Sequence, residues 1–437
     1  MSQFQQFIFE SYQFTPEDRT LRLKYALDDA YHFTETFRFN FDYVDYSPEA
    51  LDRALQLLFF VAGVSYYKKF LPPQIVVKQG DIDTPTAQFL GKTYQKGLGE
   101  LFYVNQLDPN TPVAFPATMQ SKQPVTVHGE GKLIGLGGGK DSLVTVELLR
   151  QADQNLATWS LNHQSQLTPL VERVGLPHYW VEREWDPQLA QLKGKSYSGH
   201  VPISAIFACV GAVVCILSGK RDNVVSNEQS ANEPTLHYQG VDINHQYSKS
   251  QEFEQDFQQI LAHNFGDSLR YYSFLRPYSE VRIGELFATI GFEKYKDVFS
   301  SCNRAFIHTS DRMSWCGECS KCAFVYMVLA PFIKEDDLNA LWHGKNLLKD
   351  PALETTYRNL LGIEGDKPLD CVGEVKESRE AMHLSQSIYP KLREKYQFEL
   401  PEDYSYRTLG SDQMPADVKE LFAKVTAPFE QNDGQRG

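Results

Sequence analysis

The sequence predicts an α/β protein with a parallel sheet at its centre, an α+β region before it and a helical region after it. From Lys132 onward, apolar strand patterns alternate with helical patterns, which is typical of a parallel sheet covered by helices. Before that point the apolar runs are short and alternate with polar residues, and beyond Pro331 the chain is charged and helical in tendency. A chain of 437 residues has room for several domains. We expect four parts, at residues 1–125, 126–300, 301–330 and 331–437.

Two kinds of local signal organise the first part. Alternation of apolar residues predicts antiparallel strands or hairpins around Leu21, Leu23, Tyr25, Leu27, Phe33, Phe37 and Phe39. Ser47-Pro48-Glu49 is a helix start, and Gly63 closes the apolar run that follows it. Thr84-Pro85 predicts a further helix that runs towards Phe102. The stretch from Asn110 to Gly131 is then the connection to the second part.

The second part alternates between strands and helices. The predicted strands are Leu133 to Leu136, Ala157 to Leu161, His178 to Val181 and Val224-Val225, and the predicted helices are Leu143 to Leu149, Leu167 to Val174 and Ile203 to Leu217. In such a sheet the ligand site lies at the carboxyl ends of the strands. Two polar or glycine-rich segments follow strands there, at residues 137–142 and 226–232.

The first of these segments is a glycine-rich loop that is neither a P-loop nor a dinucleotide fingerprint. A P-loop would need glycine at Ile134 and Ser or Thr at Asp141, and a dinucleotide fingerprint beginning at Gly135 would need glycine at Lys140. What remains resembles the S-G-G-x-D-S loop of the PP-loop ATP pyrophosphatases, with glycine in place of the first serine. The resembling residues are Gly137, Gly138, Gly139, Lys140, Asp141 and Ser142.

This resemblance implies a PP-loop (HUP-like) nucleotide-binding domain and ATP as a substrate. In that family the loop holds the β- and γ-phosphates as a pyrophosphate leaving group, so that a substrate oxygen attacks the α-phosphorus. Glycines let the backbone approach the phosphates, Ser142 can donate a hydrogen bond, and Lys140 can act as a point charge. Mg²⁺ would offset the phosphate charge. The second segment, SNEQSAN, contributes Ser226, Asn227 and Glu228 as candidate nucleotide or substrate contacts, with ordinary turn chemistry as the alternative.

Composition narrows the possible partners. The formal net charge is −13 and the chain has no basic run, so tight binding to nucleic acid is disfavoured. The start, MSQFQQFIFE, lacks a basic-then-apolar signal, and we expect a cytoplasmic protein. The most apolar stretch, Ile203 to Leu217, is about fifteen residues and falls short of the about twenty that cross a bilayer. It predicts a buried core helix, and no membrane partner is expected.

Four of the seven cysteines form a C-x13-C-x2-C-x2-C pattern, at Cys302, Cys316, Cys319 and Cys322. Four thiolates at this spacing suit a tetrahedral structural Zn²⁺ rather than a disulfide framework. An iron–sulfur cluster is the alternative, but the bacterial ferredoxin run would place its fourth cysteine where Tyr326 stands. Cys209 and Cys215 lie in the apolar helix and are expected to be core residues.

The loop and the cysteine cluster together resemble 7-cyano-7-deazaguanine synthase, as does Leu275-Arg276-Pro277-Tyr278, but the long N-terminal part does not fit that compact enzyme. The whole chain looks like the UDP-N-acetyl-α-D-muramoyl-L-alanyl-L-glutamate epimerases of an alternative peptidoglycan route. The residues that carry this resemblance are Ala62 to Lys68, Gly137 to Ser142 and Ser226 to Asn232. It implies ATP-dependent epimerisation of the terminal L-glutamate of UDP-MurNAc-L-Ala-L-Glu through an adenylated carboxylate, with release of AMP and pyrophosphate.

The sequence does not identify the acid and base of such a reaction. Lys68, His200 and Tyr67 are candidates by residue type, although Lys68 could instead bind a substrate anion. Three other readings stay open: a synthase-like or other PP-loop ligase that activates a carboxylate, a tRNA-modifying ligase, and a nucleotide sensor without catalysis.

Overall fold

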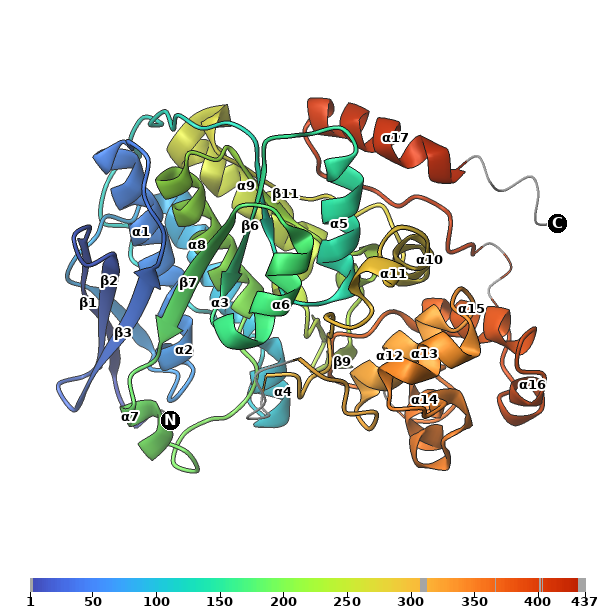
Figure 1. Cartoon of the computed structure of the whole chain (residues 1–437). Coiled ribbons are helices and arrows are strands. Elements are labelled where there is room, and N and C mark those ends of the chain that lie inside the picture. Colours follow the sequence, from blue (N-terminus) through green and yellow to red (C-terminus); the bar gives the residue numbers. More distant parts are fainter. Residues whose placement is uncertain (1–2, 307–312, 366, 401, 403, 431–437) are drawn as a thin grey trace.

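A nine-stranded sheet runs through the centre of the molecule and carries helices on both faces (Figure 1). The computed structural model describes residues 3–306, 313–365, 367–400, 402 and 404–430. The strands of this sheet, in spatial order, are β11 (Arg270–Ser273), β8 (Asp222–Val225), β5 (Lys132–Gly135), β6 (Leu156–Leu161), β7 (His178–Glu184), β3 (Tyr31–Phe39), β2 (Thr20–Leu27), β1 (Gln6–Thr15) and β4 (Gln74–Val77). A separate hairpin pairs β9 (Leu236–Tyr238) with β10 (Val241–Ile243).

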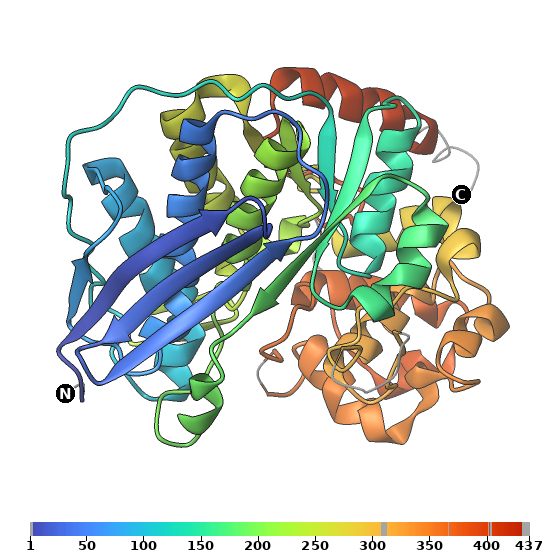
Figure 2. The same cartoon turned by 60° about the vertical axis from the view of Figure 1, so that its left-hand side comes forward.

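The sheet has a parallel half and a largely antiparallel half. Strands β11, β8, β5, β6 and β7 are parallel to one another, whereas β3, β2 and β1 form an antiparallel meander. The two halves join where β3 pairs antiparallel with β7, in a register that runs from Thr36 opposite Glu184 to Phe39 opposite Val181. Figure 2 shows the meander continuing the parallel strands. The sheet therefore crosses the first of the predicted part boundaries; the four-part division itself stays a prediction.

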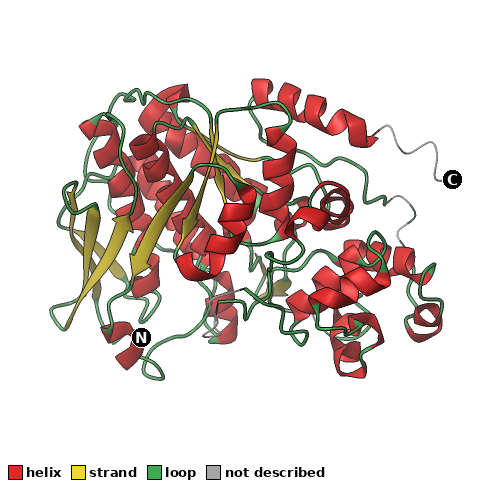
Figure 3. Cartoon of the chain, viewed as in Figure 1, coloured by secondary structure: helices red, strands yellow, loops and turns green. Residues whose placement is uncertain are grey.

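Helices surround this sheet and form most of the remaining structure (Figure 3). The α-helices are α1 (Pro48–Ala62), α2 (Val64–Tyr67), α3 (Thr84–Gly97), α4 (Gly99–Val104), α5 (Lys140–Arg150), α6 (Gln164–Val174), α7 (Gln188–Gln191), α8 (Ile203–Ser218), α9 (Gln251–Phe265), α10 (Glu280–Ile290), α11 (Phe292–Tyr295), α12 (Ser320–Leu329), α13 (Glu335–Leu341), α14 (Glu354–Leu360), α15 (Val375–Gln386), α16 (Lys391–Lys395) and α17 (Ala416–Glu430). Short 3₁₀ turns lie at Gln229–Asn232, Tyr247–Lys249, Gly266–Ser268, Leu347–Lys349 and Pro351–Leu353.

The two faces of the sheet belong to two hydrophobic cores. Leu133 packs into one core and the next residue, Ile134, into the other, because successive side chains of a strand point to opposite faces. Both side chains are fully buried, as expected for a parallel strand covered on each side. The first core holds α1 and α8, which pack together, and the second holds α5, α10 and α12.

The predicted strands and helices of the second part are confirmed, with small shifts at their ends. The helix predicted to begin at Ser47-Pro48-Glu49 is also present, as α1. Ser47 Oγ caps it by accepting a hydrogen bond from Ala50 N at 3.2 Å. The apolar stretch forms α8, whose residues from Ala208 to Ser218 are all buried. Within the described ranges of the chain, no helix is both long and apolar enough to cross a bilayer.

One predicted helix is broken in two. The pattern after Thr84-Pro85 forms α3 and then α4, with Leu98 between them at φ −97° and ψ 10°, outside helical geometry. Glycines flank this break, and glycine favours a helix interior less than other residues do. Gly97 is also packed tightly, since a Cβ there would lie 2.5 Å from Pro202.

The helical C-terminal region lies beside the carboxyl end of the parallel strands, and its last helix returns to the sheet (Figure 1). Helix α17 contacts α5. Its Phe422 packs against Phe274 and Tyr278, with ring centroids 5.4 and 5.2 Å apart. The chain ends in a polar tail, EQNDGQRG, whose composition predicts disorder; after Glu430 it lies outside the described residues.

Candidate functional site

The glycine-rich loop leaves β5 and enters α5 at the carboxyl edge of the parallel strands. Gly138 has φ +97°, and a Cβ there would meet Met313 Sδ at 2.6 Å, so this position requires glycine. Gly137 is different, because no surrounding atom lies within 4 Å of the Cβ position. Gly139 is the N-cap of α5 and offers no side-chain cap. The loop thus presents open space beside a helix N-terminus that lacks a side-chain cap, which is the setting for binding an anion.

Lys140 is engaged inside the protein. The residue is only 1% exposed. Its Nζ lies 2.5 Å from Asp141 Oδ1 and also pairs with the buried carboxylate of Glu280. Burial alone would lower the pKa of Lys140, but these two carboxylates outweigh burial and raise it. Burial likewise acts to raise the pKa of Asp141, yet the charges of Lys140 and Lys321 lower it. Lys140 therefore stays charged and organises the loop from within.

The polar segment after β8 lies against this loop, as its place at a strand end predicts. Thr145 Oγ1 of α5 lies 2.8 Å from Ser226 Oγ. The next two carbonyls are also held, since Ser273 Oγ donates to Asn227 O at 2.6 Å and Arg276 Nη1 donates to Glu228 O at 2.6 Å. The structure thus brings residues 137–142 and 226–228 together, and Glu228 is 6% exposed.

Arg276, in the segment Leu275-Arg276-Pro277-Tyr278, holds the backbone of this region from the interior of the protein. Arg276 is fully buried and forms an ion pair with Glu254 at 2.9 Å. Its Nη2 also donates to Lys249 O at 2.5 Å. One guanidinium fork therefore fixes the backbone at Glu228 and at Lys249, which suits the planar, multiply donating geometry of arginine.

Lys68 and His200, the two candidates named from residue type, lie near each other in a second polar group. Lys68 Nζ donates to Gly199 O at 2.6 Å. One polar atom from each of Glu100, His200 and His245 lies within 4.8 Å of the others. Burial lowers the pKa of Lys68 to about 8, and burial together with the charge of His245 lowers the pKa of His200 to about 4. Both groups are therefore shifted towards their neutral forms.

Tyr67, the third candidate, belongs to the aromatic core. Its ring lies 5.8 Å from that of Phe7 and 5.4 Å from that of Tyr94, and it is 5% exposed. Burial raises its pKa to about 12. This environment suits packing rather than proton transfer.

A third group contains functional candidates that the sequence did not single out. Lys249 Nζ donates to Cys371 Sγ at 3.3 Å, and Lys321 Nζ donates to Cys371 O. Burial would raise the pKa of Cys371, but Lys249, His245 and Lys321 lower it to about 6. Cys371 stands alone in the sequence and belongs to no spacing pattern, so only the fold reveals its neighbours.

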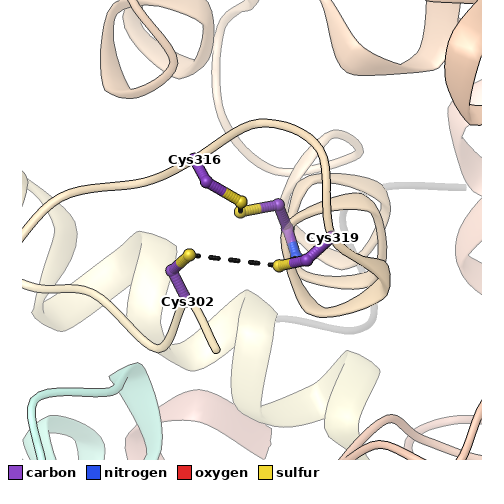
Figure 4. Close-up of side chains that lie close together, drawn as sticks. Cys302, Cys316 and Cys319 are labelled. Carbon is purple, nitrogen blue, oxygen red and sulfur yellow. Dashed lines mark hydrogen bonds between the residues drawn. The ribbon is translucent and has the colours of Figure 1, made fainter. Parts of the chain in front are cut away.

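The four cysteines of the predicted metal site converge. All four sulfur atoms lie within 4.8 Å of one another, with Cys302 and Cys319 at 3.9 Å and Cys316 and Cys322 at 3.7 Å. Figure 4 shows Cys302, Cys316 and Cys319 pointing to one point at the start of α12. The seven cysteines all lie among the described residues, and none of them forms a disulfide in this structure.

Comparison with known proteins places the chain in a family. The MurL N-terminal domain family matches residues 1–274, and the MurL C-terminal domain family matches residues 298–396. A protein of Xanthomonas oryzae pv. oryzae is 38% identical over 76% of this chain and 74% of its own length. A protein of Salinispora tropica is 36% identical over 86% of this chain and 84% of its own length. Both are named UDP-N-acetyl-α-D-muramoyl-L-alanyl-L-glutamate epimerase, and the present chain belongs to this epimerase family.

Proposed function

We propose that this protein, an epimerase by family, inverts the terminal glutamate of UDP-MurNAc-L-Ala-L-Glu at the expense of ATP. The glutamate carboxylate would be adenylated, the α-carbon inverted and the adenylate hydrolysed, which releases pyrophosphate and AMP and gives the D-glutamate product for peptidoglycan synthesis. The observation that carries the proposal is the family match, which covers the whole sheet and much of the C-terminal region.

The glycine-rich loop supports ATP as the activating substrate. The space beside Gly137 and the N-terminus of α5 would accept the phosphates, and Ser142 lies in the first turn of that helix. Burial raises the pKa of Glu280, and the charges of Asp141 and Glu228 add to this rise, so three carboxylates lie in this region. Mg²⁺ bound with the phosphates would offset the negative charge of the phosphates and of these carboxylates, so we expect Mg²⁺ to bind together with ATP.

Activation answers a chemical difficulty of epimerisation. The α-proton of a free carboxylate is very weakly acidic, because its removal adds a second negative charge to an anion. The carbonyl of an acyl adenylate is neutral, so a base can take the proton and an acid can return one on the other face. The energy of ATP also drives the cycle forward.

Zn²⁺ is the metal that the four cysteines fit best. With Zn–S bonds of about 2.3 Å, a tetrahedral site places its sulfurs about 3.8 Å apart. The sulfur separations of 3.9 and 3.7 Å agree with a single ion. An iron–sulfur cluster attaches its thiolates to several irons and would need a wider arrangement. The ion would clamp the loop at Cys302 to the start of α12, a structural role.

Solvent deuterium provides the test. During turnover of UDP-MurNAc-L-Ala-L-Glu with ATP in D₂O, we expect deuterium at the α-position of the terminal D-glutamate and none without ATP. Mass spectrometry of the product measures the label and chiral analysis measures the configuration. A synthase-like ligase would consume ATP without labelling that carbon. The proposal is wrong if AMP accumulates with this substrate while the glutamate remains L and unlabelled.

The variants Asp141→Asn and Ser142→Ala test the role of the loop. We expect each to lose pyrophosphate release while keeping the folded structure, because both residues lie in the first turn of α5 beside the glycine-rich loop. Circular dichroism and thermal melting give the control for folding. Unchanged turnover in both variants would mean that ATP binds elsewhere.

A further inference from the structure

Three nitrogen groups from two other segments of the chain lie around Cys371: His245 and Lys249 before α9, and Lys321 in α12. Lys249 ends a 3₁₀ turn before α9 and places its Nζ 3.3 Å from Cys371 Sγ. The imidazole of His245 and the thiol shift each other's pKa, and His245 Nδ1 pairs with the carboxylate of Glu100. Lys321, in the first turn of α12, donates to the carbonyl of Cys371. Segments far apart in the chain thus converge on one sulfur atom.

Lys249 differs from Lys140 and from the other two groups around the thiol, because His245 pairs with Glu100 and Lys321 lies near Glu280. Among the carboxylates that the structure describes, none lies within 4.0 Å of Lys249 Nζ, whose other hydrogen-bond partner is Gln246 Oε1 at 3.4 Å. Lys321 has Glu280 at 3.8 Å. Lys249 thus lies within hydrogen-bond distance of the sulfur, and its charge, which also acts on Glu228 and Asp141, stabilises a thiolate. By contrast, burial raises the pKa of Cys209 and Cys215, the two thiols of the core.

This thiol cluster adjoins the glycine-rich loop. Lys321 contacts Glu280, and Glu280 pairs with Lys140 of the loop. Arg276 links the backbone of Lys249 to that of Glu228. The charges of Lys321 and Lys249 also lower the pKa of Asp141. A carboxylate held for activation at the loop would therefore bring its α-carbon into the region of the thiol cluster.

Resting on the function proposed above, we propose that Cys371 is one of the two groups that exchange the α-proton of the activated glutamate. The thiolate takes the proton from Cα, and the electron pair of the broken C–H bond moves into the acyl carbonyl to give an enolate. A protonated amine, imidazole or water on the opposite face then donates a proton to Cα as the electron pair returns. Both groups regain their starting states by proton exchange with solvent.

The surroundings also give the opposite face a candidate. Lys68 and His200 lie in the polar group that contains Glu100, and Glu100 is the partner of His245 in the thiol cluster. The carboxylate of Glu100 therefore lies between the group of Lys68 and His200 and the group of His245 and Cys371. This arrangement places proton donors and acceptors from two groups of residues around one carboxylate.

The test separates the two half-reactions. We expect Cys371→Ser and Cys371→Ala to keep ATP–pyrophosphate exchange within about threefold of wild type, while α-deuterium incorporation in D₂O falls roughly 10²–10⁴-fold, the usual contribution of a general base. Cys209→Ala is the matched control, since it removes a buried thiol of the core, and it should keep both activities. Thermal melting of each variant reports whether it folds.

A second measurement needs no variant. In the wild-type protein, alkylation of Cys371 by iodoacetamide, followed by peptide mass spectrometry, should reach half its maximal rate near pH 6 and should slow when ATP and substrate are bound. The inference is wrong if Cys371→Ala incorporates deuterium at the wild-type rate. It is also wrong if that variant loses both ATP–pyrophosphate exchange and deuterium incorporation, or if alkylation of Cys371 begins only above about pH 8. If the wild-type protein itself shows neither ATP–pyrophosphate exchange nor labelling, the proposed function fails and the inference fails with it.

Discussion

Thr145 Oγ1 lies 2.8 Å from Ser226 Oγ, and this contact ties the helix after the glycine-rich loop to the polar segment after β8. Thr145 is fully buried in the second turn of α5, and Ser226 follows the last residue of the strand. The carboxyl ends of β5 and β8, adjacent in the sheet, are thereby joined by side chains as well as by strand pairing. The geometry of the site depends on this contact.

Removal of the Thr145 hydroxyl should loosen the site without emptying the core. Thr145→Val keeps the shape of the side chain but leaves Ser226 without this partner, so we expect a loss of about 1 kcal/mol in the free energy of unfolding. Pyrophosphate release should fall roughly tenfold, which corresponds to a barrier increase of about 1.4 kcal/mol. Urea titration and a pyrophosphate assay measure the two effects. Thr145→Ser keeps the hydroxyl but loses a buried methyl group, so its stability should fall by about 1 kcal/mol while pyrophosphate release stays near wild type. An equal fall of pyrophosphate release in both variants would contradict this explanation.

Two neighbouring glycines should respond to alanine in opposite ways. Gly137→Ala places its methyl group in open space, so the melting temperature should stay within about 2 °C of wild type. That methyl group should nevertheless keep the phosphates from the backbone and lower kcat/KM for ATP roughly 100-fold. Differential scanning calorimetry and steady-state kinetics separate these effects.

Gly138→Ala is the contrasting variant. With φ at +97° and Met313 Sδ at 2.6 Å from the added Cβ, it should cost about 2 kcal/mol or more of stability. Its melting temperature should therefore fall by several degrees. Full activity in Gly137→Ala, or an unchanged melting temperature in Gly138→Ala, would show that the loop has another conformation in solution.

The cysteine cluster predicts a defined metal content. We expect about one zinc ion per chain by inductively coupled plasma mass spectrometry, and loss of that ion in Cys319→Ser or after chelation. Helix α12 begins at the cluster and lies in the second core, so loss of the metal should lower the melting temperature. Cys371→Ser should keep its zinc. Protein purified with iron, or with neither metal, would rule out this assignment.

His178 should make the protein sensitive to mild acid. Burial lowers its pKa to about 4, while the ordinary value is 6.5. Below pH 6.5 the unfolded chain binds a proton that the folded protein does not, so stability falls as pH drops towards 4. Between pH 7 and pH 5 this group should cost about 2 kcal/mol of unfolding free energy.

His178→Gln tests this acid sensitivity. Glutamine does not titrate and can keep the hydrogen bond that His178 Nδ1 makes with Thr158 Oγ1 at 2.8 Å. Urea unfolding at pH 7 and pH 5 should show a smaller acid loss in the variant than in wild type. An identical loss in both proteins would mean that other groups, such as His200, account for all of it.

Local patterns were enough to predict much of the fold and part of the site. The helix at Ser47, the apolar helix α8 and the strand before Gly137 each have their signal within a few neighbouring residues. The same holds for residues 137–142 and 226–228, because strand ends in a parallel sheet meet at one edge. The ordering of the sheet was not predictable in this way.

The remaining features depend on contacts between distant segments. Strand β3 pairs with β7 although nothing near either strand marks the other as its partner. Cys371, Lys249 and His245 belong to no sequence motif. Only the fold shows that the thiol of Cys371 lies beside basic side chains. Lys140 shows the converse, since its motif suggests a contact with ATP whereas its ammonium pairs with Asp141 and Glu280.

The junction between β3 and β7 also sets an order of events during synthesis. Glu35 on β3 and Arg183 on β7 form a fully buried ion pair, and they are 148 positions apart in the chain. When the meander leaves the ribosome its carboxylate has no cation, and an unpaired charge resists burial. The edge of the meander at β3 therefore stays hydrated until β7, in the parallel half of the sheet, has been translated. Such long-range pairing is slow, and we expect the closing of this junction to limit the rate of folding.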